Sequence, residues 1–281
     1  MSDLIFNHNA AAQPMSMQEL KNKVPYAFLS APSRSVSDKY VHLPTSRVVE
    51  DLQKLGWYPV QAQQTATKQG KKSNYSKHMI AFRNDDIMIK GKNGDDAFPQ
   101  IILTNSHDGL SAFKFMVGIY RLVCSNGLVV ADEEFANFRI RHRGYSFEEL
   151  QEVVAKVIEE VPRKVEVMNK MTAKELTKKE QEELALKALL LRRGIAPGSE
   201  KAKKTEYDQE TLDDILEPTR SQDAGDNLWV VFNRVQEKMI RGGFTAALTG
   251  KKARKVKSLR SFQTDIKLNQ ELFKLASSMA E

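Results

Sequence analysis

Apolar residues between positions 41 and 145 mostly alternate with polar ones, and only one stretch follows helical spacing. That stretch carries four apolar residues on one helical face, and they are Val48, Val49, Leu52 and Leu55. Thr45 or Ser46 stands where a side chain caps a helix, and Gly56 where a left-handed residue ends one. We therefore expect a short helix at the start of this region.

Period-two alternation predicts a sheet after this helix. Strands are expected over residues 57–68, 78–82, 100–104, 113–119 and 135–143. On one of these strands, His78, Ile80 and Phe82 should lie on one face. On another, the residues expected on one face are Phe113, Phe115, Val117 and Ile119. Asp108-Gly109 and Asn126-Gly127 are signals for tight turns between strands, so the sheet should be mainly antiparallel.

Helical spacing dominates after residue 146. Ser146 with Glu149, and Thr177 with Glu180, have the spacing of capping boxes that begin helices. Pro162 should end or kink the first of these helices. Residues 194–225 are typical of a loop-rich linker. A helix is expected over 226–241, with Asp226 as its N-cap, and another over 265–279.

Strands followed by helices predict an α+β fold, with an antiparallel sheet in the N-terminal half, a helix before it and a mainly helical C-terminal half. We divide the chain into an N-terminal arm (1–40), a β-rich core with its leading helix (41–145) and a helical region (146–281). The helical region includes an acidic linker (205–225) and a basic segment (251–260).

The composition narrows the class of protein. Hydrophobic residues make up 41% and charged residues 28%, which excludes a wholly disordered chain, a collagen-like repeat and a disulfide scaffold. Cys124 is the one cysteine and lies in an apolar run, so we expect a buried thiol in a reducing compartment. The sequence has no apolar run long enough to span a bilayer and no signal peptide at its start, which predicts a cytoplasmic protein.

No residues suggest bond chemistry. Ser106, His107 and Asp108 are adjacent, whereas a catalytic triad needs side chains that converge from separate places. The five histidines, at positions 8, 42, 78, 107 and 142, lack the spacing of metal ligands on a helix. We therefore expect no catalytic residues, no metal and no cofactor.

Basic residues form three groups, on a chain with a net charge of +7. On a strand, Arg139, Arg141 and Arg143 would share one face, about 6.6 Å apart. The basic segment contains six cations and no acid, and they are Lys251, Lys252, Arg254, Lys255, Lys257 and Arg260. A weaker group lies on a hairpin, and it comprises Lys71, Lys72 and Lys77. Such groups are typical of phosphate contacts, and Trp57, Tyr58, Tyr75 and Tyr145 are available for base stacking.

Four stretches together resemble an uncharacterised phage and plasmid-like protein family with a domain of unknown function. They are Leu55–Ala62, Asn105–Gly109, Tyr120–Leu128 and Leu228–Gly243, and the likeness covers about residues 20–275. The resemblance implies that the protein is encoded by bacteriophages, prophages or plasmids, and it identifies no catalytic residues. In outline, the helix ending in Leu55-Gly-Trp57, the hairpin and the long helix are also similar to Rad52-like phage single-strand annealing proteins, which form rings.

The leading functional hypothesis is sequence-independent binding of nucleic acid, single-stranded DNA in particular, in phage or plasmid DNA metabolism, with annealing or recombination as its use. One alternative is an interaction protein that binds and blocks a host defence or replication factor. A second is a metal-dependent nuclease that uses the acidic residues between Glu206 and Asp226. The sequence leaves open whether the chain forms a homo-oligomer.

Overall fold

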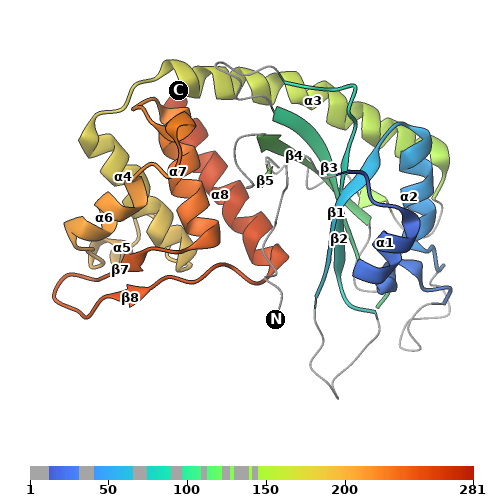
Figure 1. The fold of residues 1–281 in the computed structure, drawn as a ribbon, viewed down its shortest axis with the longest axis horizontal. Helices are drawn as coiled ribbons and strands as arrows, with labels where there is room; N and C mark the ends of the chain where they lie inside the picture. Colours follow the sequence, from blue (N-terminus) through green and yellow to red (C-terminus); the bar gives the residue numbers. More distant parts are fainter. Residues whose placement is uncertain are drawn as a thin grey trace. The chain divides into compact units, whose positions relative to one another are not determined.

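The computed structural model describes residues 13–31, 41–65, 75–89, 97–108, 113–121, 127–129, 139–140 and 145–281 (Figure 1). The chain forms two units: a sheet unit that ends at Pro162 and a helical unit over Arg163–Glu281. Strands in the first half and helices in the second confirm the α+β class. Among the described residues, no helix is long and apolar enough to cross a membrane.

Three short helical elements precede the sheet: α1 (Met17–Lys23), the 3₁₀ helix η1 (Pro25–Phe28) and α2 (Thr45–Lys54). The Met15 N–H donates to the carbonyl of Pro59, 2.7 Å away, so the chain before α1 is fastened to the first strand. Helix α2 buries the apolar face that its spacing predicted, and Gly56 ends it with a φ of 80°. Pro44, not Thr45 or Ser46, occupies the N-cap, and no side chain caps the helix.

The sheet has six strands, all antiparallel: β1 (Tyr58–Gln64), β2 (His78–Arg83), β3 (Ala97–Asn105), β4 (Phe113–Arg121), β5 (Gly127–Val129) and β6 (Arg139–Ile140). Strands β1 to β5 neighbour one another in chain order, as Figure 1 shows for the first four, and β6 pairs with β4. This order is that of a meander, in which hairpins join successive strands.

The apolar faces predicted for single strands meet in rows that cross the sheet. Ile80 pairs with Leu103 and Leu103 with Phe115, while in the next row Phe82 pairs with Ile101. These five side chains are fully buried. Because the side-chain period of a strand is two, this register puts every member of a row on the same face.

Helix α3 (Phe147–Ala173) is longer than its sequence pattern indicated. The Ser146 hydroxyl accepts from the N–H of Glu149, as the capping pattern predicted. Pro162 lies inside the helix and does not end it. Proline lacks the N–H that would bond one turn back, but apolar burial before it, at Val157, and after it, at Met171, favours continuation.

The helical unit contains α4 (Lys178–Arg192), α5 (Glu200–Lys203), α6 (Gln209–Leu216), the 3₁₀ helix η4 (Ser221–Asp223), α7 (Leu228–Arg241) and α8 (Phe262–Ala280). A small hairpin joins β7 (Thr245–Ala246) to β8 (Arg254–Lys255). Thr177 and Glu180 form the expected capping box of α4. The loop-rich linker expected over 194–225 is wrong in part, because α5 and α6 occupy much of it.

Helix α7 is the centre of this unit, because eleven of its fourteen residues are buried. Its rings Trp229 and Phe232 stack with centroids 6.0 Å apart, and Phe232 meets Phe273 of α8 edge-on at 6.3 Å. Asn227 caps the helix by accepting from the N–H of Val230, so the expectation that Asp226 is the cap was wrong by one residue.

A buried polar chain links α7 to α8. Gln236 donates to the side-chain oxygen of Asn269 over 2.7 Å, and Asn269 donates to the Asp265 carboxyl over 2.6 Å. Burial raises the pKa of Asp265 to about 7, although the bond from Asn269 and the positive charge of Arg192 act in the opposite direction. A carboxyl that holds its proton near neutrality has little solvent around it.

The stability of the fold should therefore depend on pH through Asp265. Its pKa in the fold exceeds the ordinary 3.8, so its contribution is present below about pH 4 and lost as the pH rises through 7. Asp265→Asn removes this ionisation, and we expect the variant to be more stable than the wild type at pH 8, by up to about 4 kcal/mol. Urea unfolding over a pH series from 4 to 8 measures the effect.

Glu217→Gln is the control, because Glu217 is an exposed carboxyl near the end of α6. Its curve of stability against pH should follow that of the wild type. If the stability of Asp265→Asn fell with pH as steeply as that of the wild type, the pH dependence would not come from Asp265.

Candidate functional site

The basic segment, residues 251–260, contains the largest group of uncompensated charge in the helical unit. The side chains of all six of its cations are exposed, and they are Lys251, Lys252, Arg254, Lys255, Lys257 and Arg260. Within the part of the chain that the structure describes, none of these six side chains has a hydrogen bond or an ion pair. Their charge is therefore available to an external anion.

The backbone of the basic segment is nevertheless fixed. The Val256 N–H donates to the carbonyl of Phe244 over 2.8 Å, and the Gly243 N–H donates back to the carbonyl of Val256 over 2.9 Å. Further along, the Leu259 N–H donates to the carbonyl of Ile240, at the end of α7. A guanidinium N–H of Arg192 donates to the carbonyl of Lys257. These bonds hold the segment extended against the C-terminus of α7.

Gly242 makes this close approach possible. Its φ is +66°, and a Cβ at this position would stand 2.4 Å from the carbonyl oxygen of Val256. The approach of two backbones and the left-handed conformation both exclude a larger residue. Gly242 is thus a structural requirement of the basic segment.

The arginine group of the sheet unit is described in part. Residues 139–140 form strand β6, as predicted, and Ile140 is fully buried. The side chain of Arg139 lies outside the described residues, and so do Arg141 and Arg143. The exposed face expected for the three arginines therefore stays a prediction.

The lysine group and the single cysteine are placed only in part. Lys77 is exposed and belongs to the sheet unit. Lys71 and Lys72 lie outside the described residues, as does Cys124, whose burial stays a prediction. Lys77 is therefore the one member of this lysine group among the described residues, and the grouping of the three lysines stays a prediction.

The four aromatic residues considered for stacking differ in exposure. Trp57 is a core residue, 1% exposed, whereas Tyr58 is 44% exposed. Tyr145 donates from its hydroxyl to the buried carboxylate of Asp51, 2.8 Å away. Burial acts to raise the pKa of Asp51, but bonds from Lys54 and Tyr145 outweigh it and lower that pKa. Burial together with this bond raises the pKa of Tyr145. Tyr75 and Tyr145 are half-buried, so Tyr58 is the most exposed of the four rings.

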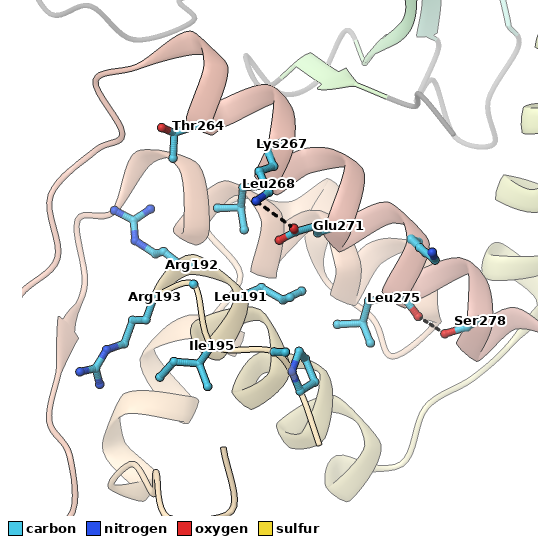
Figure 2. Close-up of a pocket in the computed structure, with 14 residues that line it drawn as sticks. Leu191, Arg192, Arg193, Ile195, Thr264, Lys267, Leu268, Glu271, Leu275 and Ser278 are labelled. Atoms are coloured by element: carbon cyan, nitrogen blue, oxygen red, sulfur yellow. Dashed lines mark hydrogen bonds and ion pairs between the residues drawn. The ribbon is translucent and has the colours of Figure 1, made fainter. Parts of the chain in front are cut away.

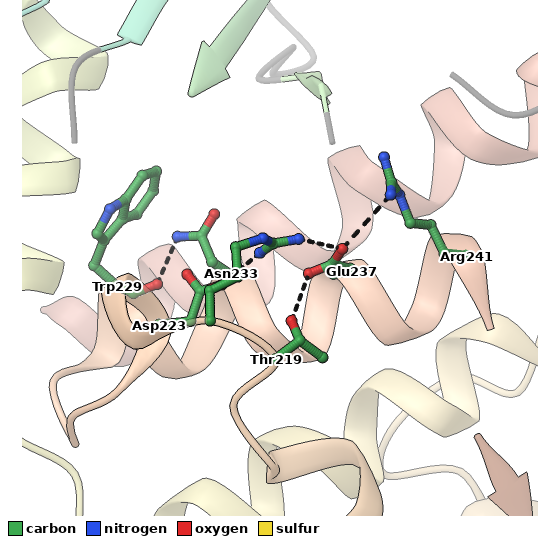
Figure 3. Close-up of polar contacts among 7 residues, drawn as sticks. Thr219, Asp223, Trp229, Asn233, Glu237 and Arg241 are labelled. Carbon is green, nitrogen blue, oxygen red and sulfur yellow. Dashed lines mark hydrogen bonds and ion pairs between the residues drawn. The ribbon is translucent and has the colours of Figure 1, made fainter. Parts of the chain in front are cut away.

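The acidic residues between 206 and 226 serve in part as internal ion-pair partners (Figure 3). Arg220 contacts the carboxylates of Asp223 and of Glu237 on α7, each at 2.5 Å. Glu237 also accepts from Thr219 and faces Arg241 at 3.8 Å, as the dashed lines in Figure 3 show. These contacts fasten the segment before α7 to the helix itself.

Two further carboxylates have internal partners. Asp214 of α6 contacts Lys238 at 3.1 Å and accepts from the N–H of Thr245. Asp226 accepts from Gln181 of α4 at 2.9 Å. Across the described residues, no three histidine, cysteine or acidic side chains are grouped so that they could bind a metal ion. The described residues of the acidic linker therefore provide no group of side chains that converge as metal ligands.

A polar cluster that the sequence did not predict lies at one end of the sheet. The His78 and His107 rings lie 5.5 Å apart, and His107 meets His42 edge-on at 4.8 Å. Thr45 is shared among them: its hydroxyl lies 2.8 Å from Nε2 of His78 and 3.2 Å from Nε2 of His107. Asn105 donates to the same hydroxyl over 3.0 Å. Thr45, His78, Asn105 and His107 are all buried.

The hydrogen bonds of this cluster are mutually consistent. Nδ1 of His78 lies 3.3 Å from the carbonyl of Ser76, to which it donates in the neutral ring. Nε2 of His78 then accepts the one hydroxyl proton of Thr45, whose two lone pairs can accept from Asn105 and His107. This use of the hydroxyl explains why Thr45 does not cap α2. The arrangement is a structural polar core.

The sequence carried a signal for this cluster. His78 begins β2 and His107 follows β3, and His78 pairs directly with Asn105. Antiparallel neighbours bring the start of one strand to the end of the next. Ligand spacing along a single element does not reveal this convergence, because it arises from the pairing of two strands. Ser106 and Asp108 bond to each other over 2.7 Å, which fits the polar corner expected there.

Comparisons with known proteins place this sequence in a family. A family model described as "Domain of unknown function (DUF932)" matches residues 32–273. The chain belongs to the DUF932 family. This DUF932 chain is 32% identical over 276 residues to the UPF0380 protein YfjQ of Escherichia coli (strain K12), and 32% identical over 271 residues to the UPF0380 protein YafZ of the same strain. Each match covers 95% of this chain and 92% of the relative. No solved structure matches.

Thr45 should be essential to the stability of the polar cluster. Thr45→Val keeps the shape but leaves buried groups of His78, His107 and Asn105 without their shared partner. We expect a loss of about 1 to 3 kcal/mol in the free energy of unfolding. Thr45→Ser keeps the hydroxyl and is the matched control, expected to cost about 1 kcal/mol for its missing methyl. Equal losses in the two variants, measured by denaturant unfolding, would contradict the role of the hydroxyl.

Gly242 and Gly250 form a matched pair for testing the fixed backbone. Both have a positive φ, but a Cβ on Gly250 meets nothing within 4 Å. Gly250→Ala should cost about 1 kcal/mol, for the left-handed conformation alone. Gly242→Ala should cost more, because the segment must move away from α7. Proteolysis between 251 and 260, read by mass spectrometry, should accelerate in Gly242→Ala and not in Gly250→Ala.

Proposed function

We propose that this DUF932 protein binds single-stranded nucleic acid, DNA in particular, without sequence preference. The observation that carries the proposal is the basic segment: six exposed cations, none with an internal partner, on a backbone that hydrogen bonds hold extended. Like charges repel, and a fold tolerates them together where solvent or an anionic partner screens them.

The extended backbone suits a polyphosphate. Residues two apart on an extended backbone are separated by about 6.6 Å, comparable with the phosphate spacing of an extended single strand. Each phosphate that a cation neutralises releases condensed counterions, which drives binding. Preorganisation by the bonds to Phe244 and Ile240 lowers the entropy lost when the segment binds.

Phosphate contacts carry no base information, so this interface should bind all sequences about equally. We place the activity in phage or plasmid DNA metabolism, with strand annealing or recombination as its use. Support for that setting is the likeness of the four stretches to phage and plasmid proteins and the outline shared with annealing proteins. A protein that blocks a host factor would present the same cations to an acidic protein surface, and the test below separates the two.

Salt dependence tests the proposal. Changing Lys251, Lys252, Arg254 and Lys255 together to Ala removes up to four phosphate contacts. Each contact on a single strand contributes about −0.7 to the slope of log K against log salt, so the slope should flatten by roughly 2 to 3. Anisotropy titrations of labelled single strands at several salt concentrations measure it, with folding checked by circular dichroism.

Four other exposed lysines of the helical unit provide the control: Lys178, Lys179, Lys201 and Lys204. Their change to Ala alters the net charge by the same amount but leaves the basic segment intact. The control should keep the wild-type slope. Equal slopes for all three proteins would remove the basic segment from the interface, and no binding by the wild type would favour a protein partner.

A further inference from the structure

A second surface of the helical unit is a groove between the end of α4 and the length of α8, with a volume of about 750 Å³ (Figure 2). Its floor is aliphatic and includes Leu191, Ile195, Leu268 and Leu275. Leu191 and Leu275 are only half-buried. The groove thus exposes apolar surface that a partner could cover.

The spacing along α8 gives the groove its direction. The residues that α8 contributes recur at helical spacing, at positions i, i+3, i+4, i+7, i+10, i+11 and i+14, and they are Thr264, Lys267, Leu268, Glu271, Lys274, Leu275 and Ser278. They form one face of the helix, with a length of about 21 Å at 1.5 Å per residue. A straight groove of this length along one helix accommodates a second helix laid beside it.

The chemistry of the walls argues against a nucleic acid in the groove. No aromatic side chain lines it. Bound single strands usually stack their bases on aromatic rings. Aliphatic side chains such as Leu268 and Leu275 instead suit leucine or isoleucine anchors on a partner.

The rim is basic. The lining residues include four cations, Arg192, Arg193, Lys267 and Lys274, against one acid, Glu271, which lies 3.8 Å from Lys267. Arg193 donates to the hydroxyl of Tyr207 at 3.1 Å, which holds its side chain in place, and Lys274 is exposed. One guanidinium nitrogen of Arg192, Nη1, is buried and has no hydrogen-bond partner among the described residues.

We propose that this groove binds an acidic amphipathic helix of a partner protein. Leucine or isoleucine side chains spaced three and four residues apart fill the aliphatic floor, and flanking carboxylates pair with Arg193 and Lys274. Apolar anchors supply the affinity, and the charges select an acidic segment over a basic one.

The test uses two fluorescein-labelled helical peptides of 15 residues with leucine at positions three and four apart. One peptide carries Glu at its flanking positions and the other carries Lys there. With the full-length protein, anisotropy should show the acidic peptide binding more tightly than the basic one by at least about tenfold, the effect of about one close charge pair. Equal affinity, or no binding of the acidic peptide, would overturn the proposal.

Variants locate the site. Lys274→Glu should weaken the acidic peptide by about tenfold, whereas Lys179→Glu, an exposed lysine outside the groove, should leave it unchanged. Leu275→Glu should abolish binding while circular dichroism shows the fold retained. The quadruple Ala variant of the basic segment should bind the peptide as the wild type does, so this proposal and nucleic-acid binding fail or survive separately. Displacement of the peptide by an unlabelled single-stranded oligonucleotide, from the quadruple Ala variant as well as from the wild type, would assign the groove to nucleic acid and overturn the proposal.

Discussion

Helix α7 is buried around nearly its whole circumference, and the polar residues it carries must therefore find partners inside the fold. Arg234 donates to the backbone carbonyls of Leu216 and Gly225, and Glu237 binds Arg220. Gln236 reaches Asn269 on α8. Each of these bonds fixes a neighbouring element, so the positions of the acidic segment and of α8 both follow from the need to satisfy one buried helix.

Helix α7 also determines the backbone conformation of the basic segment. Its last residues lead into Gly242 and Gly243, and the chain returns in an extended form along the end of α7. The carbonyl of Ile240 lies at the end of the helix and has no acceptor role within it. The N–H of Leu259, in the returning segment, donates to this carbonyl. The backbone of the basic segment is thus bonded to the end of a buried helix while its cationic side chains face solvent. These backbone bonds explain how a segment with so much like charge keeps a defined conformation.

Local patterns in the sequence predicted the fold class, the apolar face of individual strands such as β4 and the capping box at Thr177. Those features depend on residues within a few positions of each other. The continuation of α3 through Pro162 and the shared hydroxyl of Thr45 depend on burial and on partners distant in sequence, which single-sequence patterns do not contain. Similarly, the basic segment was visible as a run of charge, whereas the groove requires α4 and α8 to be side by side.

Arg192 belongs to two surfaces at once. It lines the groove, and it also donates to the backbone carbonyl of Lys257 within the basic segment. A ligand that draws this guanidinium toward the groove would release the carbonyl and alter the segment. Thermodynamic linkage makes such an effect reciprocal: whatever factor groove occupancy applies to the affinity of the segment, occupancy of the segment applies to the affinity of the groove. Should both surfaces bind as proposed, this one side chain would link their two ligands.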